Sequence, residues 1–148
     1  MFGKAANPLS TRYSTGETMP KKKVLLVDDN ATIRWAVRPL FDSHPNFVVC
    51  GEAEHGSDAV EKAPNLRPDL IVIDMSMPVM NGLEAAPLLI KILPNVWLIL
   101  LTTHEFPQLF PLARSAGIHA VVPKSKTVTH LIAQAEALFG MTPLSRGA

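Results

Sequence analysis

Short apolar runs recur along the chain from Lys23 onward and predict five β-strands. Three of the runs are continuous instead of alternating, which is typical of strands that are covered on both faces of a sheet. The runs are Val24–Val27, Phe47–Cys50, Leu70–Ile73, Val96–Leu101 and Ala120–Val122.

The segments between these runs carry apolar residues at helical spacing and predict helices. The pattern is weakest at Ala59–Leu66, and Asn81 followed by Glu84 predicts a helix start with a capping box. Strict alternation of strands and helices predicts a doubly wound α/β domain with a five-stranded parallel sheet and right-handed crossovers. The helical stripes are Ile33, Val37, Leu40 and Phe41; Phe106, Leu109, Phe110 and Ala113; and Val128, Leu131, Ile132, Ala135 and Phe139.

Composition divides the chain into one domain with two short ends. Residues 1–20 are rich in Ser, Thr, Gly and Pro without periodicity, and predict a flexible N-terminal arm. Residues 21–140 hold the regular pattern, and residues 141–148 are too few for anything but a short tail. A chain of 148 residues is long enough to bury one self-sufficient core.

Charge and apolar content argue against a DNA-binding protein and against a membrane protein. The 14 Lys and Arg residues nearly balance the 13 Asp and Glu residues, so we expect no specific DNA binding, which needs a concentrated basic face. No window approaches the roughly 18 apolar residues of a membrane span, and we expect no membrane contact. The lone Cys50 excludes an internal disulfide and fits a reducing cytosol, so we expect a cytoplasmic protein.

Polar residues follow the apolar runs at the points where four of the strands end. Asp28 and Asp29 close the first strand, Asp74 the third, Thr102 the fourth and Lys124 the fifth. In an open parallel sheet, ligands bind beyond the carboxyl ends of the strands, near the point where strand order reverses. We therefore expect these side chains to line one pocket.

This set of residues predicts a site for a metal ion and a phosphoryl group. Three carboxylates at close range repel one another, and Mg²⁺ suits an all-oxygen site that leaves positions for water and phosphate. A carboxylate can attack phosphorus to give an acyl phosphate. The transferred group needs cations and hydroxyl donors around its oxygens, and Lys124 and Thr102 supply one of each.

Four segments of the sequence together resemble the receiver domain of two-component response regulators, over residues 21 to about 140. The Leu-Thr-Thr-His motif is most similar to that of the LuxR or NarL subfamily, whose members usually carry a C-terminal helix-turn-helix. We expect this helix-turn-helix to be absent here. The resemblance implies a flavodoxin-like fold with strand order 2-1-3-4-5 and five helices. The segments are Lys23–Asp29, Ile73–Gly82, Leu100–His104 and Val121–Lys124.

The resemblance implies a role for each matching acidic residue. Asp74 is implied as the phosphoacceptor. Asp29 is implied to coordinate Mg²⁺ directly and Asp28 through water. The backbone carbonyl of Ser76 is a further implied ligand, so the implied metal site consists of Asp28, Asp29, Asp74 and Ser76.

Other matching residues are implied to respond to the phosphoryl group. Thr102 is the switch hydroxyl that closes on this group, and Lys124 pairs with it. Ser76 and His104 each lie two residues past a key residue, where the family tunes dephosphorylation. The implied modulating positions are Ser76, Thr103, His104 and Val121.

Three features depart from the family pattern. Val121 stands where Tyr or Phe is usual, so the aromatic half of the switch is missing. Pro123 precedes Lys124, whereas in many members a proline follows the lysine. We expect kinks or shortened helices where proline interrupts a helical pattern, since each costs up to about 3 kcal/mol in a helix interior. These positions are Pro39, Pro87 and Pro111.

The function implied by the resemblance is that of a phospho-receiver in a two-component phosphorelay. A sensor histidine kinase or a phosphotransfer protein would supply the phosphoryl group to Asp74 in the presence of Mg²⁺, and an unknown downstream protein would read the state. Homodimerisation is a further expectation. We expect no enzyme activity beyond self-catalysed phosphotransfer and autodephosphorylation.

Three alternative hypotheses stay open on the sequence. One is a receiver-like scaffold whose output no longer depends on phosphate, which Val121 favours. Another is a transcription regulator without its DNA-binding half, since Met141-Thr-Pro143 resembles the opening of such a domain. The third is a phosphohydrolase, but such enzymes usually place a second Asp two residues after the nucleophile, where this chain has Ser76.

Overall fold

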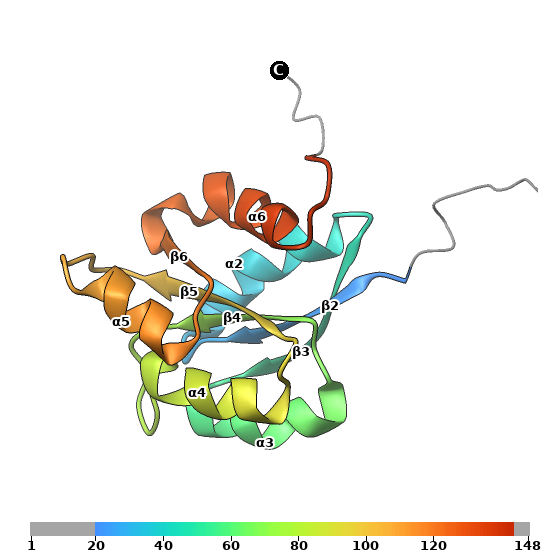
Figure 1. Cartoon of the computed structure of the whole chain (residues 1–148). Coiled ribbons are helices and arrows are strands. Elements are labelled where there is room, and N and C mark those ends of the chain that lie inside the picture. The colour runs from blue at the N-terminus through green and yellow to red at the C-terminus, as the bar shows by residue number, and fades with distance from the viewer. Residues whose placement is uncertain (1–19, 144–148) are drawn as a thin grey trace, which may run out of the picture.

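A five-stranded parallel sheet runs through the centre of the computed structural model, which describes residues 20–143 (Figure 1). The strand order is β3-β2-β4-β5-β6, so the first of these strands lies between the second and the third. The predicted order 2-1-3-4-5 is confirmed. The strands are β2 (Lys22–Val27), β3 (Phe47–Ala53), β4 (Leu70–Asp74), β5 (Trp97–Thr102) and β6 (Ala120–Pro123).

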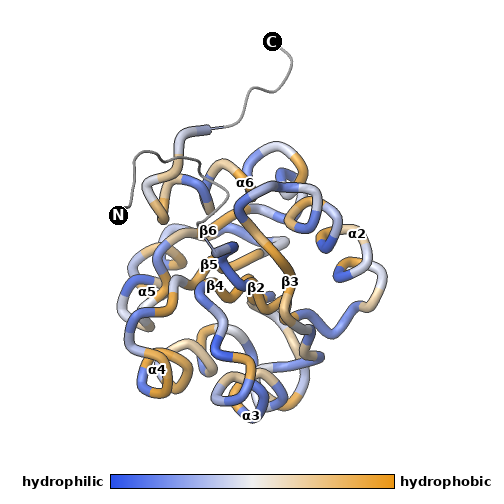
Figure 2. The backbone as a smooth tube through the Cα atoms, turned by 90° about the vertical axis from the view of Figure 1, so that its right-hand side faces the viewer, coloured by the Kyte–Doolittle hydropathy of each residue, from blue (hydrophilic) through white to orange (hydrophobic). Residues whose placement is uncertain are grey.

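Helices cover both faces of this sheet, and one hydrophobic cluster is buried on each side (Figure 1). The α2 and α6 helices share one face, and α3, α4 and α5 share the other. In Figure 2 the helices carry both orange and blue positions, as expected when one side packs on the sheet and the other meets water. The helices are α2 (Ala31–Asp42), α3 (Gly56–Leu66), α4 (Gly82–Ile92), α5 (Leu109–Ala116) and α6 (Thr127–Leu138).

The register of the parallel strands aligns their carboxyl ends at one edge of the sheet. Val27 on β2 pairs with Ile73 on β4, and Ile73 pairs with Leu100 on β5. Thr102, at the end of β5, pairs with Pro123 at the end of β6. The residues that follow these positions are therefore brought to the same place, as the sequence pattern predicts.

The structure corrects part of the predicted helical stripes. Phe106 precedes the first turn of α5, while Phe110 and Val128 are exposed. The prediction that these three residues face the core is wrong. The surface that α5 and α6 bury against the sheet includes fewer residues than the apolar pattern predicts. The members of these stripes that are buried are Leu109, Ala113, Leu131 and Ala135.

Two of the three prolines in the helical patterns lie inside helices without ending them. Pro39 is within α2 and Pro87 within α4, so neither helix is shortened at its proline, and the kinks expected as the alternative stay a prediction. Both prolines are exposed, and the missing N–H removes one helical hydrogen bond at each. Pro111 lies in the first turn of α5, where a backbone N–H has no partner within the helix.

The regular structure begins and ends within a few residues of the limits of the described part of the chain. β2 begins at Lys22 and α6 ends at Leu138. Residues 1–19 of the predicted arm and residues 144–148 of the predicted tail lie outside the described residues. Within residues 20–143, no helix combines the length and the apolar character that crossing a bilayer requires.

The loop between β4 and α4 contains a strained backbone turn at Val79. The φ angle of Val79 is 69°, and the N–H of Met80 donates to the carbonyl oxygen of Pro78 over 2.7 Å. This bond closes a three-residue γ-turn with positive φ, which is unfavourable for a β-branched residue. The side chain is 78% exposed, so little packing offsets the strain.

Replacing this valine should therefore stabilise the fold. We expect Val79→Asn to raise the free energy of unfolding by about 1 kcal/mol, because asparagine tolerates positive φ better than valine. Val128→Asn is a matched control, since Val128 is 76% exposed but lies in the helix α6. The control should change the free energy by less than about 0.5 kcal/mol. Chemical denaturation measures both, and a less stable Val79→Asn protein would contradict the strain at this turn.

Candidate functional site

Four of the predicted site residues meet at the carboxyl edge of the sheet. Asp28 follows β2, Asp74 ends β4 and Lys124 begins the short 3-10 helix η2 (Lys124–Lys126) after β6. Asp28 and Asp74 are buried, whereas Asp29 beside them is exposed. The three carboxylates have oxygen atoms that all lie within 4.8 Å of one another. The predicted convergence of the acidic residues is confirmed.

Lys124 lies between the two buried carboxylates. Its Nζ atom is 3.1 Å from Asp28 Oδ2 and 3.1 Å from Asp74 Oδ1, and its side chain is 19% exposed. Burial alone lowers the pKa of Lys124, but hydrogen bonding and attraction to the two carboxylates raise it overall. The lysine is therefore held as a cation inside the site.

One ammonium does not balance three carboxylates. Burial and the charge of Asp28 raise the pKa of Asp74, although Lys124 acts in the opposite direction. Among the described residues, Asp28 Oδ2 has no hydrogen-bond donor with suitable geometry, in spite of the nearby ammonium. The cluster thus has excess negative charge, and Lys124 reaches Asp28 Oδ2 as an ion pair without a well-aligned hydrogen bond. These oxygen ligands fit a hard divalent cation such as Mg²⁺.

The backbone after β4 is held close to the site by Gly82. The N–H of Gly82 donates to the Met75 carbonyl over 3.2 Å. A Cβ atom at this position would lie 2.5 Å from the carbonyl oxygen of Asp74. Glycine therefore allows α4 to begin directly against the strand that carries Asp74. Asn81 and Glu84 form the predicted capping box at this helix start.

An open cleft of about 580 Å³ lies beside the acidic cluster. Ser76 is exposed in its wall, and its N–H donates to Asp74 Oδ1 over 3.4 Å. The cleft gives a small molecule or a partner's side chain a route to the edge of the site from solvent. Its lining residues include Asp29, Met75, Ser76, Pro78 and Phe106.

Thr102 is buried at the end of β5, but its hydroxyl is engaged in its own loop. The hydroxyl donates to the carbonyl oxygen of His104 over 2.7 Å and accepts from the N–H of His104 over 3.1 Å. The side chains of Thr103 and His104 are exposed. The structure thus places Thr102 on the strand next to Asp74 without a hydrogen bond to it.

Val121 is half-buried on β6 and lies away from the acidic cluster. It pairs with Leu100 in the sheet and packs against the core that α4 and α5 cover. Val121 also lines a shallow hollow of about 260 Å³ together with Phe110 and Gln134. The residue is therefore near the outer surface formed by α5, β6 and α6, not in the candidate metal site.

The sequence reasoning missed Asn30, which supports the acidic pair. The N–H of Asn30 donates to Asp28 Oδ1 over 2.9 Å. Its side chain accepts from the N–H groups of Thr32 and Ile33 and so caps α2. An asparagine directly before a helical stripe is a recognised N-cap signal, so the sequence contains the information for this contact.

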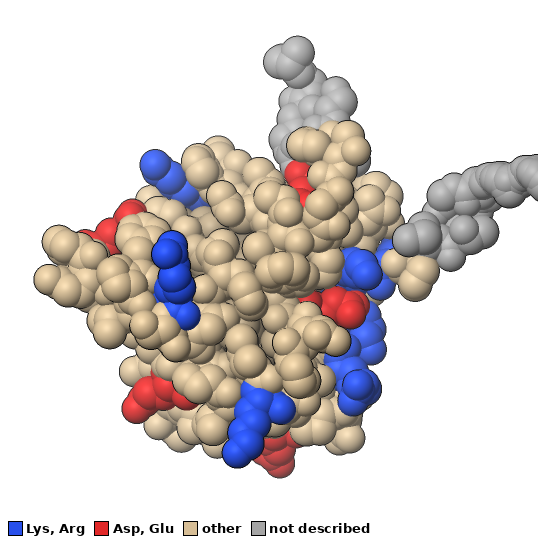
Figure 3. All heavy atoms as spheres, in the orientation of Figure 1, with Lys and Arg blue, Asp and Glu red and all other residues tan. Residues whose placement is uncertain are grey.

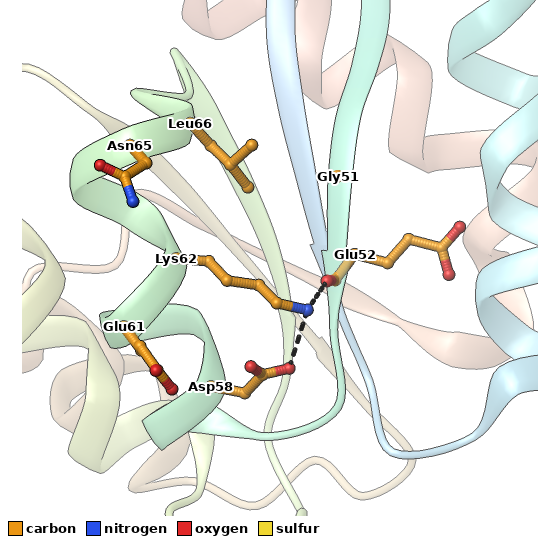
Figure 4. Close-up of a pocket in the computed structure, with 7 residues that line it drawn as sticks. All are labelled: Gly51, Glu52, Asp58, Glu61, Lys62, Asn65 and Leu66. Atoms are coloured by element: carbon orange, nitrogen blue, oxygen red, sulfur yellow. Dashed lines mark hydrogen bonds and ion pairs between the residues drawn. The ribbon is translucent and has the colours of Figure 1, made fainter.

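A second hollow, of about 530 Å³, lies between β3 and α3 at a distance from these residues (Figure 4). Lys62 reaches across it and donates to the carbonyl oxygen of Glu52 over 2.7 Å, and its ammonium is 3.2 Å from Asp58 Oδ2. β3 is an edge strand, whose free backbone groups can pair with other chains. Lys62 covers one of these groups and so protects part of the strand edge.

The comparison with protein families places the chain in a known group. The profile of the response regulator receiver domain matches residues 24–136. Over 73 residues, or 49% of this chain, the sequence is 46% identical to a protein-glutamate methylesterase/protein-glutamine glutaminase of Thermotoga maritima. That match covers 21% of the relative, and the first relatives are covered over 20% to 56% of their length.

Solved structures share the fold. The response regulator domain of Thermotoga maritima CheB superposes with a TM-score of 0.74 at 28% identity, over 83% of this chain and 99% of that one. A LuxR-family two-component response regulator from Aurantimonas sp. gives a TM-score of 0.76 at 26% identity, over 85% and 91% of the two chains. These structural matches agree with the fold of the five-stranded sheet. The chain belongs to the family of response regulator receiver domains of two-component systems.

Proposed function

We propose that the chain is a phosphoacceptor switch in which Asp74 takes a phosphoryl group from a sensor histidine kinase or a phosphotransfer protein. The observation that carries the proposal is the meeting of three carboxylates around Lys124, next to an open cleft. Mg²⁺ would be held by Asp28, Asp29 and Asp74 with the backbone carbonyl of Ser76. When bound, the ion would neutralise the acidic cluster and the oxygens of the incoming group.

The transfer is a substitution at phosphorus. A carboxylate oxygen of Asp74 forms the new P–O bond, while the P–N bond to the donor histidine breaks and its electron pair returns to the imidazole. Lys124 already lies 3.1 Å from Asp74 Oδ1, so its charge is in position for the phosphoryl oxygens. Burial of Asp74 strengthens these interactions because the local dielectric constant is low.

Thr102 would couple phosphorylation of Asp74 to a conformational change elsewhere in the molecule. Its hydroxyl donates to the His104 carbonyl in this structure, so bonding to a phosphoryl group requires that contact to break. The loop between β5 and α5 would then move with the hydroxyl. Thr103 and His104 are exposed in this loop, at positions where they can influence the access of water and the rate of dephosphorylation.

The movement of an aromatic ring cannot contribute at position 121. Valine has one stiff side-chain torsion and no polar tip, so it does not alternate between a buried and an exposed position. We propose that the signal to a downstream protein or to a second copy of the chain passes through the β5–α5 loop alone. The second candidate function is a receiver-like scaffold whose output does not depend on phosphorylation. Val121 favours it, because without the aromatic ring the conformational change on phosphorylation is smaller.

Other functions have less support. A phosphohydrolase of the Asp-nucleophile type would need an acid and base two residues after Asp74, and Ser76 cannot supply one. On the face shown in Figure 3, basic side chains gather where β2 begins, with acidic ones beside them, and much of the rest is uncharged. The mixed charges on this face fit the proposal that residues 21–140 bind DNA without sequence specificity or not at all, and a cytoplasmic location is part of the same proposal.

Phosphorylation should occur on Asp74 and should need a divalent cation. Incubation with a small phosphodonor and Mg²⁺ should add the mass of one phosphoryl group, as measured by intact mass spectrometry. Asp74→Asn should take no label, nor should the native chain with a chelator. Asp69→Asn is a matched control, because Asp69 precedes the same strand at its opposite end; it should label normally. Equal labelling of Asp74→Asn would refute the assignment.

Asp29 and Asp28 should contribute unequally to the binding of Mg²⁺. Asp28 accepts from Asn30 and lies beside Lys124, whereas no hydrogen bond to the Asp29 carboxylate occurs within residues 20–143. Asp29 is therefore free to contact the ion directly. We expect Asp29→Ala to weaken binding by about tenfold or more, and Asp28→Ala by less. Isothermal titration with Mg²⁺ measures both, and equal losses would disprove this division.

Removal of the Thr102 hydroxyl should leave phosphorylation of Asp74 intact but reduce the conformational response of the β5–α5 loop. Thr102→Ala should still take label on Asp74, because the hydroxyl bonds to its own loop before transfer. Amide NMR shifts that a phosphoryl mimic causes in the β5–α5 loop should decrease in this variant. Thr102→Ser keeps the hydroxyl and is the control. An undiminished set of shifts in Thr102→Ala would show that the hydroxyl does not transmit the change.

A further inference from the structure

We infer that Arg34 is a positioning residue that orients Asp29 toward the metal ion through the backbone. The inference rests on the proposed function and adds a residue that touches neither the ion nor the phosphoryl group. Arg34 lies on α2, and its side chain is 12% exposed. Most of the side chain is therefore enclosed by the protein, and its guanidinium group contacts the backbone of Asp28 in the acidic cluster.

The guanidinium group binds the backbone just beyond the end of β2. The strand ends at Val27, and the N–H of Asp28 still donates to the Ala53 carbonyl of β3 over 3.1 Å. The next polar group along the backbone, the carbonyl oxygen of Asp28, accepts from Nη1 of Arg34. Arg34 thus holds the peptide group between Asp28 and Asp29 after the sheet has ended.

That peptide group controls where the Asp29 carboxylate points. Asp29 is exposed, and its carboxylate makes no hydrogen bond or ion pair within the described residues. Its direction is therefore set by its own backbone and side-chain torsions, without a contact at the tip. Fixing the adjacent carbonyl removes rotation of the peptide plane and limits the positions that the carboxylate can reach.

Glu52 fixes the other side of the guanidinium group. Nε of Arg34 donates to Glu52 Oε1 over 2.7 Å, and Nη1 of Arg38 donates to Glu52 Oε2 over 2.7 Å. The hydrogen bond from Arg34 lowers the pKa of Glu52, and Arg38 lowers it further against the effect of burial. Glu52 is therefore an anion that balances the charge of Arg34, which would otherwise repel a metal ion nearby.

The position of Glu52 is itself supported from both sides of β3. Figure 4 shows its carbonyl oxygen bonded by Lys62 in the hollow beside α3, while its carboxylate points away from that hollow. On the opposite side the carboxylate meets the two arginines of α2. The chain of contacts therefore runs from an anchored edge strand through Arg34 to the acidic pair.

The planar guanidinium group of Arg34 donates two hydrogen bonds in different directions, one to Glu52 and one to the carbonyl oxygen of Asp28. A guanidinium holds both N–H donors at a fixed angle, whereas the single ammonium of lysine does not reproduce that geometry. Arg34→Lys should therefore restore only part of what Arg34→Ala loses. Arg38→Ala is the matched control, because Arg38 binds the same Glu52 from the same helix but does not contact Asp28.

Mg²⁺ titration by calorimetry gives the first test on the full chain. Arg34→Ala should weaken Mg²⁺ binding by about tenfold, the lower range for groups that orient a metal ligand. Arg38→Ala should stay within about threefold of the native chain, since its ion pairs are partly exposed. Arg34→Lys should lie between the native chain and Arg34→Ala, and it serves as the test variant if Arg34→Ala does not fold.

Phosphorylation by acetyl phosphate as a function of Mg²⁺ concentration gives the second readout. Arg34→Ala should need about tenfold more Mg²⁺ to reach the half-maximal rate of phosphorylation. Its rate at saturating Mg²⁺ should equal that of the native chain, because Arg34 acts only on the orientation of Asp29. A loss of the saturating rate would overturn the inference, since it would indicate a general disturbance of the site. Native Mg²⁺ binding in Arg34→Ala, or equal losses in Arg34→Ala and Arg38→Ala, would also overturn it. Failure of the native chain to bind Mg²⁺ would instead remove the proposed function.

Discussion

The repulsion among Asp28, Asp29 and Asp74 is the constraint around which the carboxyl edge of the sheet is organised. One carboxylate oxygen from each residue lies within 4.8 Å of the other two, and two of the three residues are buried. Lys124 offsets part of this charge, but burial and the charge of Asp28 still raise the pKa of Asp74. A folded chain keeps such a cluster only because the rest of the domain holds the backbone of these residues in place.

Several separate elements hold that backbone. The parallel sheet sets the positions of Asp28 and Asp74, since Val27 and Ile73 are paired in register. Gly82 lets α4 pack against the carbonyl of Asp74, and Asn30 caps α2 while its N–H binds Asp28. The fold alone thus assembles the proposed cation site. Preorganisation reduces the free energy that would otherwise be needed to gather like charges during binding.

The sequence predicted most of the fold and the members of the acidic cluster, because both follow from short patterns. Continuous apolar runs mark the buried strands, and polar residues at their ends must meet once the sheet is parallel. Contacts between distant residues could not be predicted this way. Arg34 and Glu52 are 18 residues apart, and neither lies in a motif that pairs them. The exposure of Val128 and the positive φ angle of Val79 likewise depend on tertiary packing and loop closure.

The free energy of unfolding of the native chain and of Asp74→Asn, with and without Mg²⁺, tests the central claim most directly. A raised pKa means that charged Asp74 destabilises the folded state relative to its neutral form at neutral pH. Without Mg²⁺ the neutral Asn variant should therefore be the more stable protein. Saturating Mg²⁺ should stabilise the native chain more than the variant, because the ion binds the folded cluster. A native chain that is more stable than Asp74→Asn without Mg²⁺, and that gains nothing from the ion, would contradict the account.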